Sequence, residues 1–346
     1  MRQAALLGNI HTKRTDYLKQ AAAQAGLPVL FVDWKEFETW KKQLAQGEWL
    51  IKIDPPFWDS CQLAQLEQLT KAYREQLHGL SQAARNNHLE FLNAPDQIAQ
   101  LLDKRICKQK LKQAGLAVTE EPDDGRYRID TPQQLFRIMR TSGMHQVFIK
   151  PVSGSGAAGV TALRWQPHTG RMALYTCAFV HEEYGLINTK RLRRFSVPGE
   201  ITAYLEQLLK LDCVVERWYA KAQAENFSYD LRAVVLDGEV QFLLGRLSKG
   251  PITNLHLNNR PIEAEKLPIE RKTLEEIAFL CKKAVNCFPG IRIAGIDILL
   301  EKETMRPRII EMNAQGDLIY QDIFHENSIY RRQVEMMLKW IRTCAD

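Results

Sequence analysis

The chain has 346 residues, of which 45% are hydrophobic, 25% charged and 9% aromatic. These proportions are typical of a folded globular protein and exclude a disordered or collagen-like chain. The length predicts two domains, or one large unit with several lobes. No apolar run approaches the roughly 18 residues that a membrane-spanning helix needs, and the first residues predict a strand and not a signal peptide. We therefore expect a cytoplasmic protein without a membrane partner.

The formal net charge of +6 comes from 47 Lys and Arg against 41 Asp and Glu. This mild and dispersed excess does not indicate a nucleic-acid partner, but it suits an anionic small molecule. The seven cysteines include no C-x-x-C pair, so neither a disulfide framework nor a zinc site is expected. One dense basic run could bind an acidic substrate such as a peptide, although a solvated loop is favoured; it contains Lys190, Arg191, Arg193 and Arg194.

Residues 1–93 alternate between strand and helix patterns. A first apolar strand at 4–7 precedes an amphipathic helix that stops at Gly26, and a second strand follows at 29–32. A third strand, 49–53, ends at Asp54-Pro55-Pro56, because proline cannot continue a paired strand. A long helix over about 60–85 and a short strand at 89–92 complete a predicted α/β domain.

Two short helices open the next segment, and a β-rich region follows. Asn93 and Pro95 mark the start of the first helix, and the second helix, which carries Lys104 and Lys108, ends at Gly115. From residue 147 the β-branched runs predict strands, interrupted by helices at 200–211 and 271–286. The fold class is therefore predicted as mixed α/β, or α+β.

A glycine-rich segment follows the strand that contains Lys150. Its Gly154, Gly156 and Gly159 satisfy G-x-G-x-x-G, but the residues that follow predict another strand and not the helix that a dinucleotide-binding fold requires. A flexible glycine hairpin between two strands can instead direct backbone N–H groups at phosphates, with the lysine as a fixed cation. The alternative is a glycine-rich turn without a ligand.

A second motif is the predicted hairpin over 295–313, centred near Thr304. That centre pairs Asp297 with Glu311, and period-two alternation places Asn313 on the same face. Such oxygen ligands suit Mg²⁺ completed by water and phosphates. The opposite face would be an apolar floor of Ile296, Ile298, Leu300, Ile310 and Met312. The alternative is a half-buried hairpin with a polar solvent face.

A third motif is a pair of strands joined at Asp237-Gly238, a strong hairpin signal. Arg232 and Arg246 lie on these strands, and arginine suits forked contacts with phosphate oxygens. Neither arginine is diagnostic by itself, because surface arginines are common.

Taken together, these motifs resemble the ATP-grasp superfamily, in particular its members with a glutathione-synthetase-like or RimK-like nucleotide fold. The resemblance covers about residues 90–320 and rests on the order of Lys104, Lys150 with its glycine loop, Glu216-Arg217-Trp218, Asp230-Leu231-Arg232, Arg246 with Asn254, Asp297 and Glu311-Met312-Asn313. It implies a pre-ATP-grasp α/β domain at 1–93. Two ATP-grasp lobes would follow at 94–214 and 215–346, with ATP between them.

The resemblance also implies roles for single residues. Lys104, Lys150 and the loop residues Ser153, Gly154, Ser155 and Gly156 would contact the nucleotide. Glu216 would accept from the adenine amino group, beside the backbone of Arg217 and Trp218. Mg²⁺, or alternatively Mn²⁺, would bind Asp297, Glu311 and Asn313. Arg232, Arg246 and Asn254 would hold the transferred phosphoryl group or an acyl-phosphate.

The implied activity is an ATP-dependent carboxylate-amine or carboxylate-thiol ligase that forms an acyl-phosphate and releases ADP and phosphate. The carboxylate would belong to a small molecule or a peptide. A small-molecule phosphotransferase and a non-catalytic nucleotide-binding regulator are the alternatives, and the oligomeric state, including a dimer, stays open.

Several residues keep two interpretations. Peptide-forming relatives often have a glycine-rich pair after the position of Asn254, and this chain lacks it. Glu225 is a candidate for the ribose hydroxyls. His256 could act as a general base or be structural. Trp218 and Tyr219 are expected in the core, with stacking on a base as the alternative.

Overall fold

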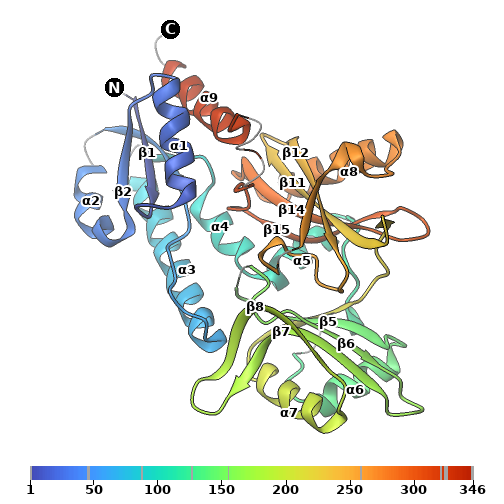
Figure 1. The fold of residues 1–346 in the computed structure, drawn as a ribbon. Coiled ribbons are helices and arrows are strands. Elements are labelled where there is room, and N and C mark those ends of the chain that lie inside the picture. The colour runs from blue at the N-terminus through green and yellow to red at the C-terminus, as the bar shows by residue number, and fades with distance from the viewer. Residues whose placement is uncertain are drawn as a thin grey trace.

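The computed structural model describes residues 2–44, 47–86, 89–125, 128–154, 156–257, 259–319, 322 and 326–343. Three sheets follow one another along the chain, each flanked by helices (Figure 1). In the described ranges no helix is both long and apolar enough to span a membrane. The mixed α/β class predicted from the sequence is confirmed.

The first sheet is parallel and has the strand order β2-β1-β3-β4. Its strands are β1 (Arg2–Gly8), β2 (Val29–Asp33), β3 (Glu48–Ile53) and β4 (Leu89–Phe91). Parallel neighbours need crossover connections, and these contain α1 (Lys13–Gln24), the short η1 (Trp34–Glu36) with α2 (Phe37–Leu44), and α3 (Leu63–Asn86). Thr12 caps α1 by accepting from the N–H of Thr15. The alternation predicted for residues 1–93 is therefore present.

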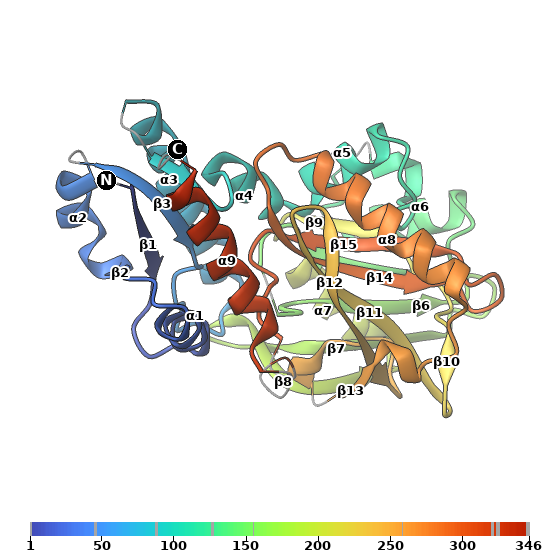
Figure 2. The same ribbon diagram turned by 90° about the horizontal axis from the view of Figure 1, so that it is seen from above.

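A helix at the other end of the chain packs against this first sheet. Helix α9 (Ser328–Arg342) lies beside α1 and runs between the first and third sheets (Figures 1 and 2). Its buried Tyr330 and Met337 join a core with Leu6 of β1 and Val234 of the third sheet. This helix was not predicted from the sequence, and its packing on α1 and β1 joins the last part of the chain to the first.

The second sheet is antiparallel, with the order β8-β7-β6-β5-β9. Its strands are β5 (Gln146–Pro151), β6 (Thr161–Trp165), β7 (Met172–His181), β8 (Gly185–Phe195) and β9 (Cys213–Arg217). Helices α4 (Pro95–Leu101) and α5 (Lys104–Gln113), the short η2 (Pro122–Gly125) and α6 (Pro132–Thr141) precede it, and α7 (Pro198–Leu208) lies between its last two strands in sequence. The core of this lobe contains Met139 of α6, Leu205 of α7 and Ile149 of β5.

The basic run at 190–194 belongs to strand β8 and not to a loop, so the loop prediction was wrong. Arg193 and Arg194 pair with Thr176 and Tyr175 of β7. The side chains are nevertheless exposed, as expected of a solvated segment. Strand β8 forms the edge of its sheet, where charged residues oppose pairing with another chain.

The third sheet is antiparallel, with the order β13-β12-β11-β14-β15 and β10 paired to β11. Its strands are β10 (Gln223–Ala224), β11 (Phe227–Leu236), β12 (Glu239–Ser248), β13 (Arg260–Glu263), β14 (Ile293–Leu300) and β15 (Pro307–Asn313). The remaining helical segments are η3 (Leu255–Leu257), η4 (Ala264–Lys266) and α8 (Arg271–Asn286). The predicted turn at Asp237-Gly238 joins β11 to β12, and both residues have the positive φ angles that such a turn requires.

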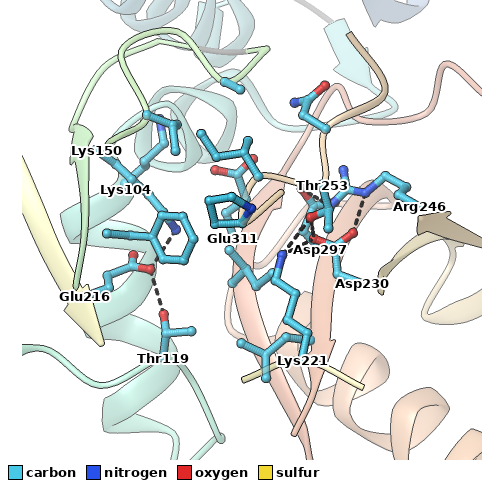
Figure 3. Close-up of a pocket in the computed structure, with 18 of the residues that line it drawn as sticks. Lys104, Thr119, Lys150, Glu216, Lys221, Asp230, Arg246, Thr253, Asp297 and Glu311 are labelled. Atoms are coloured by element: carbon cyan, nitrogen blue, oxygen red, sulfur yellow. Dashed lines mark hydrogen bonds and ion pairs between the residues drawn. The ribbon is translucent and has the colours of Figure 1, made fainter. Parts of the chain in front are cut away.

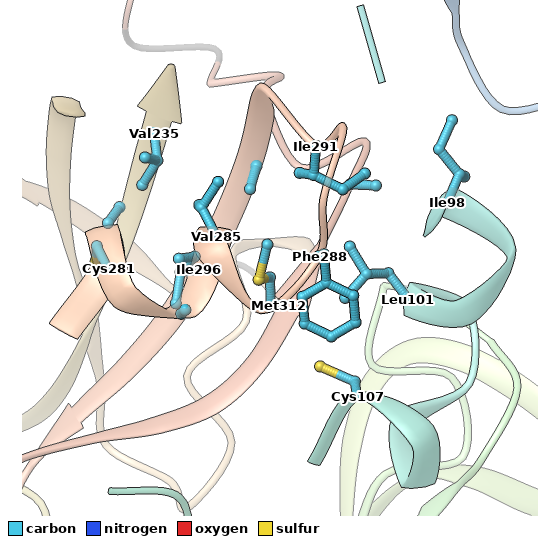
Figure 4. Close-up of a cluster of buried hydrophobic side chains, with 14 of the residues drawn as sticks. Ile98, Leu101, Cys107, Val235, Cys281, Val285, Phe288, Ile291, Ile296 and Met312 are labelled. Atoms are coloured by element: carbon cyan, nitrogen blue, oxygen red, sulfur yellow. The ribbon is translucent and has the colours of Figure 1, made fainter. Parts of the chain in front are cut away.

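One buried cluster fixes the third sheet against helices α4 and α5 (Figure 4). Val285 of α8 and Ile296 of β14 lie on one side of this cluster, and Phe288 and Met312 continue it toward Cys107 of α5. Each of these five side chains is buried. Apolar packing of this kind holds α5 and β15 in a fixed relation, and both elements carry residues of the site described next.

Candidate active site

A cavity of about 90 Å³ lies between the second and third sheets (Figure 3). It is lined from one side by α5, β5, the glycine loop and β9, and from the other by β11, β12, β14 and β15. Most of the residues predicted for the site line it: Lys104, Lys150, Gly154, Gly156, Glu216, Arg217, Arg246, Asn254, Asp297 and Glu311.

A second cavity of about 400 Å³ adjoins the first and extends toward the first sheet. The two cavities share the lining residues Gly154, Gly156, Arg246, Asn254 and Glu311. Arg232 and Asn313, which the sequence also predicted for the site, line this larger cavity. The predicted residues therefore lie around two connected spaces.

Two lysines hold one buried carboxylate on the wall formed by β9. The Nζ of Lys108 and that of Lys150 each lie 2.6 Å from a different oxygen of Glu216, and Thr119 donates to the same carboxylate at 2.9 Å. Burial alone would raise the pKa of Glu216, but the two lysines lower it to about 2. Glu216 is therefore ionised at neutral pH.

The hydrogen-bond partners distinguish the lysines from one another. Lys108 also donates to the carbonyl and hydroxyl oxygens of Thr119, at 3.1 and 2.7 Å, so its three N–H groups are all used. Lys150 donates to Glu216 and Lys104 donates to the carbonyl of Gly154 at 2.7 Å. In the described part of the chain these two lysines each retain two N–H groups for a ligand.

The glycine loop connects two antiparallel strands, as the sequence predicted, because Ile149 of β5 pairs with Thr161 of β6. Gly159 has a φ of +68°, and a Cβ there would lie 2.8 Å from side-chain atoms of Leu63 and Pro151. Only glycine fits this position without strain. Ser153 does not line either cavity, and Ser155 lies outside the described residues.

On the opposite wall, charged residues alternate across β11, β12 and β14. Arg246 lies 2.7 Å from Asp230 and 3.1 Å from Asp297, and Arg232 donates to the other oxygen of Asp297. Burial opposes ionisation of both carboxylates, yet the cations lower the pKa of Asp230 to about 2 and that of Asp297 below its usual value. This network fixes the two guanidiniums at the junction of the cavities.

The predicted pairing of Asp297 with Glu311 is confirmed, and Gly295 pairs with Asn313. The register then shifts, so that Ile298 pairs with Ile309. The predicted apolar floor is therefore wrong at one position: Ile309 joins the buried core, whereas Ile310 lines the cavity with Glu311. An extra residue in one strand changes which side chains face inward.

The side-chain oxygens on these strands suit a hard cation whose remaining coordination positions are filled by phosphate or water. Asp297 and Glu311 both line the first cavity, and Asn313 lies within 3.3 Å of Glu311. In the described ranges no group of three or more His, Cys, Asp or Glu side chains forms a complete metal cage. Mg²⁺ commonly binds in this incomplete way, through one or two carboxylates plus phosphates and water.

No protein-family model matches the chain, and no curated protein matches it. Solved structures do. The ATP-grasp ligase PsnB, complexed with minimal precursor, Mg and ADP, superposes with a TM-score of 0.60 at 14% identity, covering 97% of each chain. The macrocyclase MdnC from Microcystis aeruginosa MRC, bound with precursor peptide MdnA, gives 0.60 at 14%, covering 97% of this chain and 100% of that one. The D-cycloserine synthetase DcsG gives 0.58 at 12%, covering 96% and 99%.

The chain has the ATP-grasp fold. The superposition covers nearly the whole length of this chain and of these structures, so the fold suggested by the order of motifs is confirmed.

Within this ATP-grasp fold, the backbone predicted to lie beside adenine belongs to Arg217 at the end of β9 and to Trp218 directly after it. The N–H groups of Arg217 and Trp218 already donate to the carbonyls of Glu120 and Gln146, at 2.8 and 3.0 Å. The Trp218 ring packs against Phe148 and does not line the cavity. Tyr219 does line it. These two N–H groups are therefore already used within the protein, and the role of the Arg217 and Trp218 backbone beside adenine stays a prediction.

Two further residues, Glu225 and His256, had two interpretations from the sequence. Glu225 lines neither cavity and forms an ion pair with Arg260 at the surface, which does not support a ribose contact. The side chain of His256 lies outside the described part of the chain.

Sequence reasoning missed Lys221 and Thr253, which extend the Asp230 network into the first cavity. Lys221 donates to Thr253 at 2.7 Å and to Asp230 at 3.2 Å, and Thr253 also donates to Asp230. Burial lowers the pKa of Lys221. The sequence signal was weak, because Lys221 lies nine residues before its partner in a segment without regular periodicity.

Proposed function

We propose that the chain is an ATP-dependent ligase that activates a carboxylate as an acyl-phosphate and transfers the acyl group to an amine or thiol. The observation that carries this proposal is the pairing of Asp297 with Glu311, flanked by Arg232 and Arg246, where the two cavities meet. One cavity would take the nucleotide and the other the acceptor. The similarity to solved ATP-grasp ligases supports the same assignment.

In the first step, a carboxylate oxygen of the acceptor would attack the γ-phosphorus of ATP, and the bond to the ADP oxygen would break. Lys104 and Lys150, with their remaining N–H groups, would hold phosphate oxygens. Arg232 and Arg246 would neutralise charge on the transferred group, because each is fixed by a buried carboxylate before the substrate arrives.

In the second step, the nucleophile would attack the acyl carbon and phosphate would leave, taking up the proton that the amine or thiol loses. Mg²⁺, which appears with ADP in the PsnB complex, would be held by Asp297, Glu311 and Asn313 and would neutralise the phosphates; Mn²⁺ is the alternative ion for the same ligands. No side-chain nucleophile is required. Positioning and charge neutralisation would supply most of the acceleration.

The test follows γ-labelled phosphate from ATP while the protein meets Mg²⁺ and fractions of metabolites and peptides. Free phosphate that appears with particular fractions, and disappears in an Asp297→Asn variant, is the expected result. Label on a stable product would instead identify a phosphotransferase. ATP binding without any turnover would favour a regulatory protein and overturn the ligase proposal.

A further inference from the structure

The larger cavity has a composition that bears on the acceptor. It lies between the carboxyl ends of the strands in the first sheet and the third sheet, with Pro55 and Trp58 on one side and Arg232 on the other. Its volume of about 400 Å³ is within the range of small-molecule sites. Because it shares Arg246 and Glu311 with the smaller cavity, a ligand in it would reach the proposed phosphate position.

Cationic donors are available at the end nearest the nucleotide cavity. Arg232 uses its Nε for Asp297 and one Nη1 hydrogen for the carbonyl of Gly316 at 3.2 Å. Arg246 uses its Nε for Asp230 and one Nη2 hydrogen for Asp297. A guanidinium has five N–H groups, so each retains three for a ligand in the described part of the chain. Such donors suit a carboxylate.

Elsewhere in this cavity two side-chain amides are already used by the protein. The amide of Asn259 donates to the carbonyls of Ile252 and Asn254, both at 2.9 Å. The amide of Gln315 donates to the carbonyl of Ile53 at 2.9 Å and to the hydroxyl of Tyr73 at 2.8 Å. A second polar group on a ligand would therefore find no unused N–H on either of these amides.

The remaining cation, Arg14, is matched by buried acids. It forms an ion pair with Asp317 and donates to the carbonyl of Gln315 at 2.8 Å. Lys52 lies 3.3 Å from the same Asp317 and also pairs with Asp54. Arg14 uses two of its five N–H groups in these contacts. Because Arg14 and Lys52 together face the carboxylates of Asp317 and Asp54, this cluster carries no excess positive charge to attract a second anionic group.

Apolar side chains form the rest of the wall. Ile98, Leu101 and Ile319 are buried around the cavity, and partly exposed apolar residues complete the lining: Trp58, Leu102, Leu255 and Leu318. Each apolar group of a ligand that is removed from water against such a surface contributes favourably to binding. A charged group at the same place would lose its hydration without a partner.

We propose that this cavity selects an acceptor with a single carboxylate, held at Arg232 and Arg246, and an apolar body that lies against Trp58. The assignment rests on the proposed ligase function and specifies its substrate class. Trp58 would determine specificity without taking part in the reaction.

A matched pair of probes tests this inference. Octanoate and suberate have the same eight-carbon length, but suberate carries a second carboxylate at the far end. With ATP, Mg²⁺ and hydroxylamine, octanoate would displace ADP to form octanoyl phosphate. Hydroxylamine would then displace phosphate and yield the hydroxamate, which reports activation without knowledge of the natural nucleophile. The expected kcat/KM is at least tenfold higher for octanoate than for suberate.

Two variants identify the site of selection. Trp58→Gln is expected to lower octanoate turnover at least tenfold and to leave suberate turnover within about threefold. Its neighbour Phe57 is 72% exposed and lines neither cavity, so Phe57→Gln serves as the control and should change neither. Titration calorimetry of octanoate and suberate in the absence of ATP gives a second readout that does not depend on turnover.

The outcomes separate this inference from the ligase proposal. Hydroxamate formed equally well or better from suberate would overturn the apolar acceptor and leave the ligase function standing. Tighter octanoate binding that is lost in Trp58→Gln but kept in Phe57→Gln, without hydroxamate, would support the cavity assignment while the ligase proposal fails. Absence of both binding and hydroxamate with octanoate would overturn the cavity assignment.

Discussion

Asp297 of β14 pairs directly with Glu311 of β15. Next to this pair β15 contains one extra residue, Ile310, because Ile298 pairs with Ile309. The irregularity brings Ile310 to the cavity beside Glu311, while Ile309 takes the buried position. Two carboxylates and one apolar side chain thus face the same space. A regular ladder would have placed Ile310 in the core.

The acidic pair gives the first prediction. Asp297→Asn or Glu311→Gln should lower Mg²⁺-dependent ATP turnover at least a hundredfold, because each removes a charged oxygen ligand from an incomplete metal site. Nucleotide affinity measured without Mg²⁺ should change little for Glu311→Gln. The control is Glu303→Gln, at an exposed position in the turn between β14 and β15. Full Mg²⁺-dependent turnover in either site variant would contradict the metal assignment.

The two lysines that contact Glu216 give the next prediction. Lys150→Met should raise the Kd for ATP at least tenfold, since Lys150 retains donors toward the cavity. Lys108→Met should leave the Kd within about threefold, because its donors are all used by Glu216 and Thr119. The Lys108 variant should instead unfold at lower urea concentration. If both variants lost the same affinity for ATP, the number of unused N–H groups on each lysine would not explain which lysine binds the nucleotide.

Glu216 couples stability to pH. Glu216→Gln should destabilise the protein by about 3–5 kcal/mol at pH 7, because it leaves two buried lysines without their counter-charge. Urea unfolding measures this difference, and Glu206→Gln on the exposed face of α7 is the matched control.

The sign of the pH effect follows from the lowered pKa. The folded-state pKa of Glu216 is about 2, below the usual value of 4.5, so its ionised form stabilises the fold above about pH 4.5. This contribution, about 3 kcal/mol, should disappear as pH falls from about 4.5 toward 2. The stability gap between wild type and Glu216→Gln should therefore narrow over that range. A constant gap would argue against the ion pairs as its source.

The glycine loop supplies a steric prediction. Gly159→Ala should destabilise the protein by about 2–4 kcal/mol, because the positive φ and the close approach of Leu63 and Pro151 both oppose a Cβ. Gly170→Ala is the control: its φ is also +68°, but no atom lies within 4 Å of an added Cβ, so only about 1 kcal/mol is expected. Thermal unfolding of both variants makes the comparison. Similar losses would mean that backbone conformation alone accounts for the effect.

Features that depend on local periodicity could be predicted from the sequence. The alternation around Asp297 and Glu311 defined a strand pair with one polar face, and Asp237-Gly238 defined the turn between β11 and β12. Likewise, the strand that follows Gly159 excluded a dinucleotide-binding turn. Strand pairing follows from residues close in sequence, which is why these elements were accessible. The extra residue of β15 was not, since a bulge leaves the composition of the strand unchanged.

The sequence by itself determined which residues carry charge and which short segments form hairpins, because side-chain alternation and turn chemistry act over a few residues. Only the tertiary structure decided which of those charged residues contact one another. Lys108 and Lys150 converge on Glu216 from α5 and β5, and Arg14 meets Asp317 across 303 positions of the chain. These contacts arise where whole sheets pack together, and packing of apolar faces, including α9 on the first sheet, fixes their distances.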